Sequence, residues 1–291
     1  MERGLLWTAV AGFLAVAVIG TVSGRVHVQK RPTGGSIVSL SPNATEIVFA
    51  LGLGERLVGV STACDYPPEA KHLRKAGDLG APNIELIYAL KPELVIGTML
   101  RDPEMKKVVE RCGARLLTIE QQRLDEIPDA ILAVGEAAGV PDAARRRADA
   151  LRARIARATV DVPDDERPRV FIELSGQPLR TAAEGTFVDD LIGRAGGRNI
   201  AHDLGPGWIT VSPDTVVARD PEIIIVAHPI GLDGRYALGQ RIGWNGISAV
   251  RSGRVVDDLD LSLILRPGPR VAEGLEALAR LFAAYREARG K

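Results

Sequence analysis

Short apolar runs alternate with longer amphipathic segments from residue 36 onward. Runs rich in Val, Ile and Leu are typical of buried strands, and apolar positions three or four residues apart are typical of helices. The pattern predicts strands at residues 36–40, 57–60, 94–97 and 115–119, a long loop at 61–82, and helices at 41–51, 84–90, 104–112 and 125–138. Such alternation favours a parallel sheet covered by helices on both faces.

A connecting segment of different composition follows. Residues 141–160 alternate arginines with alanines, contain no glycine, and have proline only at the first position. This composition predicts a long helix with a narrow apolar stripe. At 1.5 Å per residue it would span about 27 to 30 Å, close to the width of a small domain. An ordinary surface helix within one domain is the alternative interpretation.

The strand and helix pattern then restarts. Strands are expected at 170–174 and 222–226, helices at 187–194 and 212–219, a short helix leading into a strand at 246–256, and a closing amphipathic helix at 269–288. The chain is therefore predicted to be an α/β protein. Its lobes, residues 36–140 and 168–291, each contain a parallel sheet and are joined by the helix at 141–160.

The two halves share a motif. Glu85 precedes Pro92 by seven residues, Asp214 precedes Pro221 by seven residues, and an apolar strand follows each proline. Such a repeat indicates an internal duplication. Ligands of open α/β lobes bind at the carboxyl ends of the strands, so two facing lobes would form a ligand cleft there.

The N-terminal segment predicts export. Residues 5–22 are almost wholly apolar, with Arg3 before them and Arg25 after them. A segment of about 18 residues lies at the border between a secretory signal and a single membrane span. We expect residues 1–24 to be a signal peptide cleaved near Ser23, with an N-terminal membrane anchor as the alternative. Both place the folded lobes in the periplasm or on the outer face of the cell membrane.

Composition narrows the class of protein. Hydrophobic residues make up 46% of the chain, charged residues 25%, and the formal net charge is zero. These values describe a globular chain and argue against nucleic-acid binding. Cys64 and Cys112 are expected at opposite edges of a sheet, whereas a disulfide needs Cα atoms within about 7 Å. We therefore expect two free thiols.

Signatures of catalysis are missing from the sequence. No P-loop and no Gly-x-Ser-x-Gly sequence occurs, which removes common signs of phosphate-binding enzymes and hydrolases. The histidines show no metal-binding spacing, although His72, His202 and His228 could converge as a metal-ion receptor site. A hydrolase that uses Asp65, Tyr66 and His228 is the rival class, but no nucleophile paired with a base is visible. We expect no enzymatic activity, no cofactor and no resident metal.

Several motifs resemble one protein family. They are residues 39–46 (SLSPNATE), 58–60 with 64–68 (CDYPP), 82–85 with 90–95, and 249–255 (AVRSGRV). Over residues 36–288 the chain is similar to the helical-backbone (class III) substrate-binding proteins of ABC importers. Within the group that carries cobalamin, iron-siderophores or haem, it is most like the cobalamin branch. The resemblance implies two Rossmann-like lobes on one rigid helix, limited closure, and a monomer that passes a bulky chelate to a permease dimer.

The same resemblance implies ligand contacts. Trp208 and Arg266 match a ligand-contacting tryptophan and a cleft arginine of the cobalamin branch, and Tyr66 lies in the equivalent cleft loop of the first lobe. Taken alone, Trp208 in its glycine-rich loop could instead pack as a lid on its own lobe, and Arg266 could be a solvated loop charge. Trp244 is expected to be structural.

Some positions depart from the cobalamin branch. Leu79 and Thr98 stand where cobalamin binders tend to carry further aromatic residues, and Ser262 stands where they carry a cleft acid. With aromatic residues at 4% of the chain, a corrinoid would have fewer stacking surfaces than usual. The predicted ligand-binding residues are Asp65, Tyr66, Thr98, Trp208, Ser262 and Arg266.

Glu85 and Asp214 are the predicted docking residues. In the family that this chain resembles, such a pair contacts arginines of the two permease subunits. Asp214 is shorter than the usual glutamate. The alternative is a local role, because a carboxylate in the first turn of a helix gains about 0.3 to 1 kcal/mol from the helix dipole.

Overall fold

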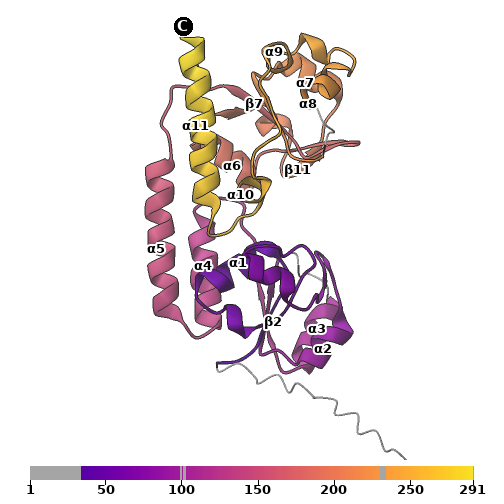
Figure 1. Ribbon diagram of the computed structural model, residues 1–291, viewed down its shortest axis with the longest axis vertical. Helices are drawn as coiled ribbons and strands as arrows, with labels where there is room; N and C mark the ends of the chain where they lie inside the picture. The colour runs from indigo at the N-terminus through magenta and orange to yellow at the C-terminus, as the bar shows by residue number, and fades with distance from the viewer. Residues whose placement is uncertain (1–33, 99, 101–102, 230–233, 291) are drawn as a thin grey trace, which may run out of the picture. The chain divides into compact units, whose positions relative to one another are not determined.

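The computed structural model describes residues 34–98, 100, 103–229 and 234–290 (Figure 1). The predicted signal peptide or membrane anchor, residues 1–24, lies outside the described residues. Among the residues that are described, no helix is long and apolar enough to cross a membrane.

The N-terminal lobe is built on a parallel four-stranded sheet with the order β2-β1-β5-β6. Its main elements are β1 (Ile37–Ser39), β2 (Leu57–Val60), β5 (Leu94–Gly97), β6 (Arg115–Thr118), α1 (Pro42–Ala50), α2 (Ile84–Leu90), α3 (Pro103–Arg111) and α4 (Glu126–Ala137). Strands β1 and β5 are buried along their whole length. A strand covered on both faces is apolar at every position, which explains the continuous apolar runs in the sequence.

The C-terminal lobe repeats this topology in the order β10-β7-β12-β13, again with parallel neighbours. Its main elements are β7 (Arg169–Glu173), β10 (Arg198–Asn199), β12 (Ile223–Val226), β13 (Val255–Val256), α6 (Phe187–Arg194), α7 (Pro213–Arg219), α8 (Gly234–Gly239), α9 (Ser248–Arg251) and α10 (Leu261–Leu265). Strand β7 takes the place of β1, and β12 takes the place of β5. The predicted α/β fold class with two parallel sheets is confirmed.

Helices α2 and α7 begin and end in the same way. Each has seven residues, and each is capped by a side chain that accepts a hydrogen bond from a backbone amide of the first turn, Asn83 at 2.9 Å and Ser212 at 3.1 Å. Each ends on a non-glycine residue in the left-handed conformation, Lys91 and Asp220, directly before a proline. That conformation is uncommon outside glycine, so its recurrence supports an internal duplication.

Helix α5 (Pro141–Ala158) joins the lobes and packs beside α4 and α11 (Val271–Arg289) (Figure 1). The predicted helix at 141–160 is therefore confirmed, with its end at Ala158. The narrow apolar stripe is its buried face, and a stripe of this width suits a helix that packs on one side only. The buried positions of α5 are Ala144, Ala148, Leu151 and Ile155.

One cluster of buried apolar side chains continues from the first sheet to the second. Its members include Ile96 of β5, Leu151 of α5, Leu191 of α6, Ile172 of β7 and Phe282 of α11. The two lobes thus share an apolar core along the helices that join them. Separating the lobes would expose this core to water, which is unfavourable.

A small antiparallel sheet departs from the predicted pattern. It contains β8 (Ser175–Gly176), β9 (Leu179–Ala182) and β11 (Trp208–Thr210) in the order β11-β9-β8. Trp208, expected in a glycine-rich loop, is the first residue of edge strand β11 and pairs with Ala182. A strand this short shows no readable periodicity, and its partner lies far away in the sequence. The loop prediction for Trp208 was wrong for that reason.

The predicted long loop at 61–82 also contains short elements. They are a 3-10 helix (Pro68–His72) and the antiparallel hairpin of β3 (Gly77–Asp78) and β4 (Ala81–Pro82). Further 3-10 turns lie at Gly54–Arg56, His202–Leu204 and Trp244–Gly246.

Two local predictions agree with the structure. Trp244 is fully buried and meets the ring of Phe171 edge-on, with the centroids 6.3 Å apart. The tryptophan is therefore a core residue. Cys64 is buried, Cys112 is partly buried, and both are free thiols.

Gly135→Ala is expected to destabilise the protein. A Cβ at Gly135 of α4 would lie 2.1 Å from the Cβ of Ala144 on α5, and overpacking of this kind typically costs about 1–3 kcal/mol. The free energy of unfolding, measured by urea denaturation, should fall by about that amount. Gly193→Ala in α6 is the matched control, because nothing lies within 4 Å of its Cβ position, and helix propensity should raise stability by up to about 1 kcal/mol. Equal effects of the two substitutions would contradict the close α4–α5 contact.

Candidate functional site

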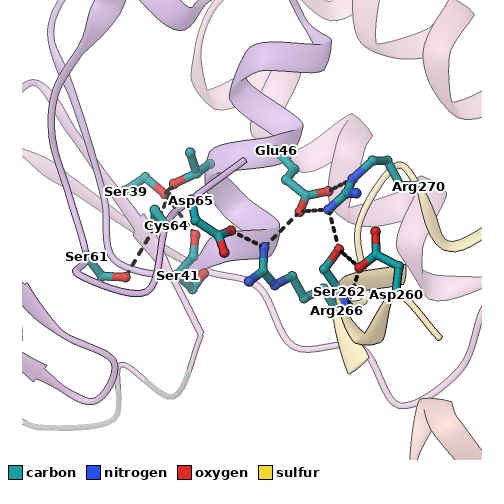
Figure 2. A network of polar contacts seen from close by, with 11 residues as sticks. Ser39, Ser41, Glu46, Ser61, Cys64, Asp65, Asp260, Ser262, Arg266 and Arg270 are labelled. Atoms are coloured by element: carbon teal, nitrogen blue, oxygen red, sulfur yellow. Dashed lines mark hydrogen bonds and ion pairs between the residues drawn. The ribbon is translucent and has the colours of Figure 1, made fainter. Parts of the chain in front are cut away.

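A buried carboxylate connects the two lobes. Glu46 lies on α1, is 4% exposed, and accepts hydrogen bonds from Arg270 Nε at 2.9 Å and Nη2 at 2.7 Å (Figure 2). Arg270 directly precedes α11, so the pair links the first helix of the N-terminal lobe to the last helix of the chain. The Glu46 carboxylate raises the pKa of Arg270. Paired hydrogen bonds between charged groups are strong and directional, and this pair therefore sets the orientation of both side chains.

Arg266 is the second cation beside Glu46. Its Nη1 donates to Asp65 Oδ1 at 2.6 Å and lies 3.5 Å from Glu46 Oε1 (Figure 2). The Arg266 side chain is 20% exposed, so the ion pairs form where water screens them only in part. The Arg266 guanidinium holds the pKa of the Asp65 carboxyl below its usual value. Arg266 is therefore a fixed, paired charge rather than a solvated one.

Ser262 and Asp260 extend the network at α10. Asp260 caps this helix and accepts hydrogen bonds from the Ser262 amide at 2.9 Å and the Ser262 hydroxyl at 2.6 Å. The Ser262 Oγ in turn accepts a hydrogen bond from Arg270 Nη2 at 3.1 Å (Figure 2). The Ser262 hydroxyl thus links the Asp260 carboxylate to the Arg270 guanidinium.

Tyr66 stacks on Arg270. The guanidinium carbon lies 3.6 Å from the ring centroid, a cation–π contact that holds the ring in place. The tyrosine is still 42% exposed, so part of its surface is available to a ligand. A recess of about 400 Å³ adjoins it, lined by Glu46, Phe49, Ala50, Tyr66, Pro67, Glu69, Pro269 and Arg270.

Trp208 and Thr98 lie outside these contacts. Trp208 is 45% exposed and meets the ring of Phe187 on α6 edge-on, with the centroids 6.1 Å apart. Trp208 thus packs partly on its own lobe, as expected for a lid, and it keeps the exposed surface that a ligand contact needs. Thr98 follows β5 and is partly exposed. Among the described contacts, none joins Thr98 or Trp208 to the Glu46 network.

Sequence reasoning missed Glu46 and Arg270 as site residues. Glu46 closes the motif SLSPNATE, but its partner is 224 positions away. The available signal was a single acid in a first helix that is otherwise uncharged, because a buried carboxylate needs a cation. The spacing of Arg266 and Arg270 around Pro269 was the matching signal at the other end of the chain.

The predicted histidines have other partners. His228 Nε2 lies 2.7 Å from Glu173 Oε1. His202 Nδ1 lies 2.8 Å from Asp189, which raises the pKa of His202. Within the described part of the chain, no group of three or more His, Cys, Asp or Glu side chains is placed to hold a metal ion. The structure therefore does not assemble His72, His202 and His228 into a metal site.

The rival hydrolase arrangement is not assembled either. The Glu173 carboxylate that faces His228 also accepts two hydrogen bonds from Arg241, each at 2.7 Å. Asp65 instead pairs with Arg266. In the contacts that the structure describes, His228 therefore has no link to Asp65 or Tyr66 that would form a catalytic pair.

A wider recess of about 850 Å³ follows α6 and the segment after α5. Among its lining residues, Arg194 donates to Asp190 at 3.2 Å, and Arg194 also contacts Asp125. The Leu124 amide donates to Asp190 at 2.8 Å. These bonds form a second polar connection between the lobes. None of the predicted ligand-binding residues lines this recess.

Glu85 and Asp214 occupy the same exposed position, the second residue of α2 and of α7. The hydrogen-bonding caps of these helices are Asn83 and Ser212, not the two acids. Their local contribution is thus limited to the interaction with the helix dipole. Both carboxylates remain available for an external partner.

The two parallel-sheet lobes, the linking helix and the polar site at their junction fit the substrate-binding proteins of ABC importers that the sequence motifs resemble. Residues 37–260 match the family described as periplasmic binding protein. The chain belongs to this family.

Named relatives agree with that membership. An uncharacterised ABC transporter substrate-binding lipoprotein of Bacillus subtilis is 35% identical over 266 residues, which is 87% of this chain and 81% of the relative. A vitamin B12-binding protein of Vibrio cholerae is 31% identical over 246 residues, which is 82% of this chain and 86% of the relative.

Solved structures have the same fold. The periplasmic haem-binding protein RhuT from Roseiflexus sp. RS-1 superposes with a TM-score of 0.76 and 32% identity over 86% of this chain and 98% of that one. The periplasmic vitamin B12-binding protein BtuF of Vibrio cholerae gives a TM-score of 0.72 and 29% identity over 87% of this chain and 98% of that one.

Glu46→Ala should lower the free energy of unfolding by about 3–5 kcal/mol, because it leaves Arg270 without its buried partner. Adding Arg270→Met should recover part of this loss, so that a double-mutant cycle gives a coupling energy of at least about 1 kcal/mol. Urea denaturation gives the free energy of unfolding of Glu46→Ala, Arg270→Met and the double variant.

The control for this cycle is Asp149→Ala, in a pair with Arg152 whose side chains are 63% and 43% exposed. Its removal should change stability by less than about 1 kcal/mol. If Glu46→Ala cost no more than the control, the structural importance of the buried pair would be refuted.

Proposed function

We propose that the chain binds one bulky metal chelate, a cobalamin or related corrinoid, between its lobes and delivers it to an ABC importer. The observation that carries this proposal is Tyr66, an exposed aromatic ring held by Arg270 beside the paired cation Arg266. The vitamin B12-binding names of several relatives support the choice of ligand.

The chemistry of the proposed site suits such a ligand. Tyr66 and Trp208 offer ring surface, on which a flat macrocycle can stack. Asp65, Ser262, Thr98 and Arg266 offer hydrogen-bonding groups for the polar periphery of the ring, and a few placed polar groups among apolar walls are typical of small-molecule sites. An iron-siderophore or a haem is the alternative ligand, supported by the haem-binding names of solved structures with this fold.

The remaining assignments follow from this role. The protein would be a monomer without catalytic activity, nucleic-acid partner or resident cofactor, because delivery of an intact chelate needs none of these. Residues 1–24 would act as a signal peptide or membrane anchor and place the lobes in the periplasm or on the outer face of the cell membrane. Residues 36–140 and 168–291 would then move little on the connecting segment 141–160.

The partner proposed for Glu85 and Asp214 is the permease dimer of the importer. Both acids are exposed at equivalent positions of duplicated lobes. A pair of acids can bind basic groups on two related subunits, and charge complementarity of this kind fixes orientation and speeds association. The exposure of both residues and their lack of a capping role support this assignment.

Ligand titration tests the proposed function. Following tryptophan emission while cobalamin, cobinamide, haem or ferric siderophores are added should show at least one Kd below about 10 µM, which corresponds to roughly −7 kcal/mol. Trp208→Ala should raise the Kd for that ligand about tenfold, the loss of affinity expected for a stacked aromatic ring. Trp244, which is fully buried, remains as the reporter. Failure of every ligand to bind in this range would refute the assignment.

Replacing Glu85 and Asp214 together with alanine should abolish uptake in proteoliposomes that hold the partner importer, while ligand affinity and thermal stability stay nearly unchanged. Asp142→Ala is the matched control. Asp142 is also the second residue of its helix, α5, and its side chain is 83% exposed, but we assign it no role in docking. Normal uptake by the double variant, or loss of ligand binding, would show that the acids do not dock.

A further inference from the structure

The positive charge of Arg266 is already compensated within the protein. Its Nη1 is 2.6 Å from Asp65 Oδ1 and 3.5 Å from Glu46 Oε1. Glu46 is in turn bound by Arg270 through paired hydrogen bonds, and its side chain is 3% exposed. Arg266 cannot turn away from these partners without leaving a buried carboxylate less well paired, which is costly.

The network as a whole carries a slight excess of negative charge. Three carboxylates, of Glu46, Asp65 and Asp260, face two guanidiniums, of Arg266 and Arg270 (Figure 2). The Arg266 guanidinium lowers the pKa of Asp65, and the Glu46 carboxylate raises the pKa of Arg270. Asp65 and Arg270 therefore stay charged at neutral pH. Asp65 and Asp260 are exposed, and 53% of the Asp65 side chain is accessible.

We infer that Asp65 determines ligand specificity by neutralising Arg266, so that the site takes ring ligands with uncharged amide side groups in preference to ring ligands with free carboxylates. This inference rests on the proposed function, and it concerns the same site. It assigns to Asp65 a role in discrimination in addition to any contact with the ligand.

The preference follows from hydrogen-bonding chemistry. An amide carbonyl can accept from Arg266 while the amide N–H donates to Asp65, so both protein groups stay satisfied. A ligand carboxylate can only accept, and at Arg266 it would lie close to the charges of Asp65 and Glu46. Like charges a few Å apart repel, and a partly desolvated site screens this repulsion poorly. A free carboxylate on the ligand is therefore penalised.

The test compares two corrinoids with the same ring and cobalt. Dicyanocobinamide carries amide side groups, and dicyanocobyrinic acid carries carboxylates at the corresponding positions. The wild-type protein should bind the amide form at least about tenfold more tightly. Asp65→Asn removes the charge and keeps an oxygen that can accept from Arg266. It should reduce the ratio of the two Kd values by about tenfold, chiefly by strengthening binding of the acid form.

Asp142→Asn is the matched control. Asp142 is an exposed acid at the start of α5, and it lies outside the described Arg266 contacts and outside the recess beside Tyr66. The control removes the same charge elsewhere on the protein and should leave the Kd ratio within about twofold of wild type, because screening weakens distant charges. Thermal unfolding of both variants checks that they fold.

The outcomes separate the two proposals. If cobinamide binds and the ratio is unchanged in Asp65→Asn, the specificity role of Asp65 is overturned while the proposed function stands. An equal change in Asp142→Asn would also overturn it, because the effect would then be one of net charge. If neither corrinoid binds to any variant, the proposed function fails, and the inference fails with it.

Discussion

The buried carboxylate of Glu46 constrains the structure on both sides of the lobe junction. An unpaired charge in this place would cost several kcal/mol, and the cations that compensate it come from the segment that leads into the last helix. The charge of Glu46 in the N-terminal lobe is therefore compensated only when α11 is in position. The same interaction aligns Arg270 beneath Tyr66 and holds Arg266 next to Asp65. Relative orientation of the lobes and preorganisation of the site thus have one physical origin.

Three features resist movement of the lobes. Helix α5 is continuous, with its buried stripe packed against α4 and α11. The apolar cluster extends through these helices into both sheets. Polar bonds at Glu46 and at Asp190 join the lobes in two separate places. Opening the cleft widely would break hydrogen bonds and expose apolar surface together, whereas a hinge of irregular loops absorbs motion at a few backbone angles. Limited closure around a ligand is the behaviour that this construction favours.

Duplication explains why the two lobes present similar features to their surroundings. The repeated helix carries a side-chain cap, an exposed acid at its second position and a left-handed residue before proline in both lobes. The Glu46 network does not follow this symmetry, since its paired cations, Arg266 and Arg270, come from one segment near the end of the chain.

The sequence alone determined the α/β class, the repeat, the connecting helix and most strands and helices, because buried strands and one-sided helices leave regular apolar patterns over several residues. By resemblance it also predicted Asp65, Tyr66, Ser262 and Arg266 as ligand-binding residues, and the structure brings these four into one network of contacts. Only the tertiary structure decided that Glu46 and Arg270 organise this network and that Trp208 begins an edge strand. These features depend on contacts between residues far apart in the chain, and local periodicity carries no information about such pairs.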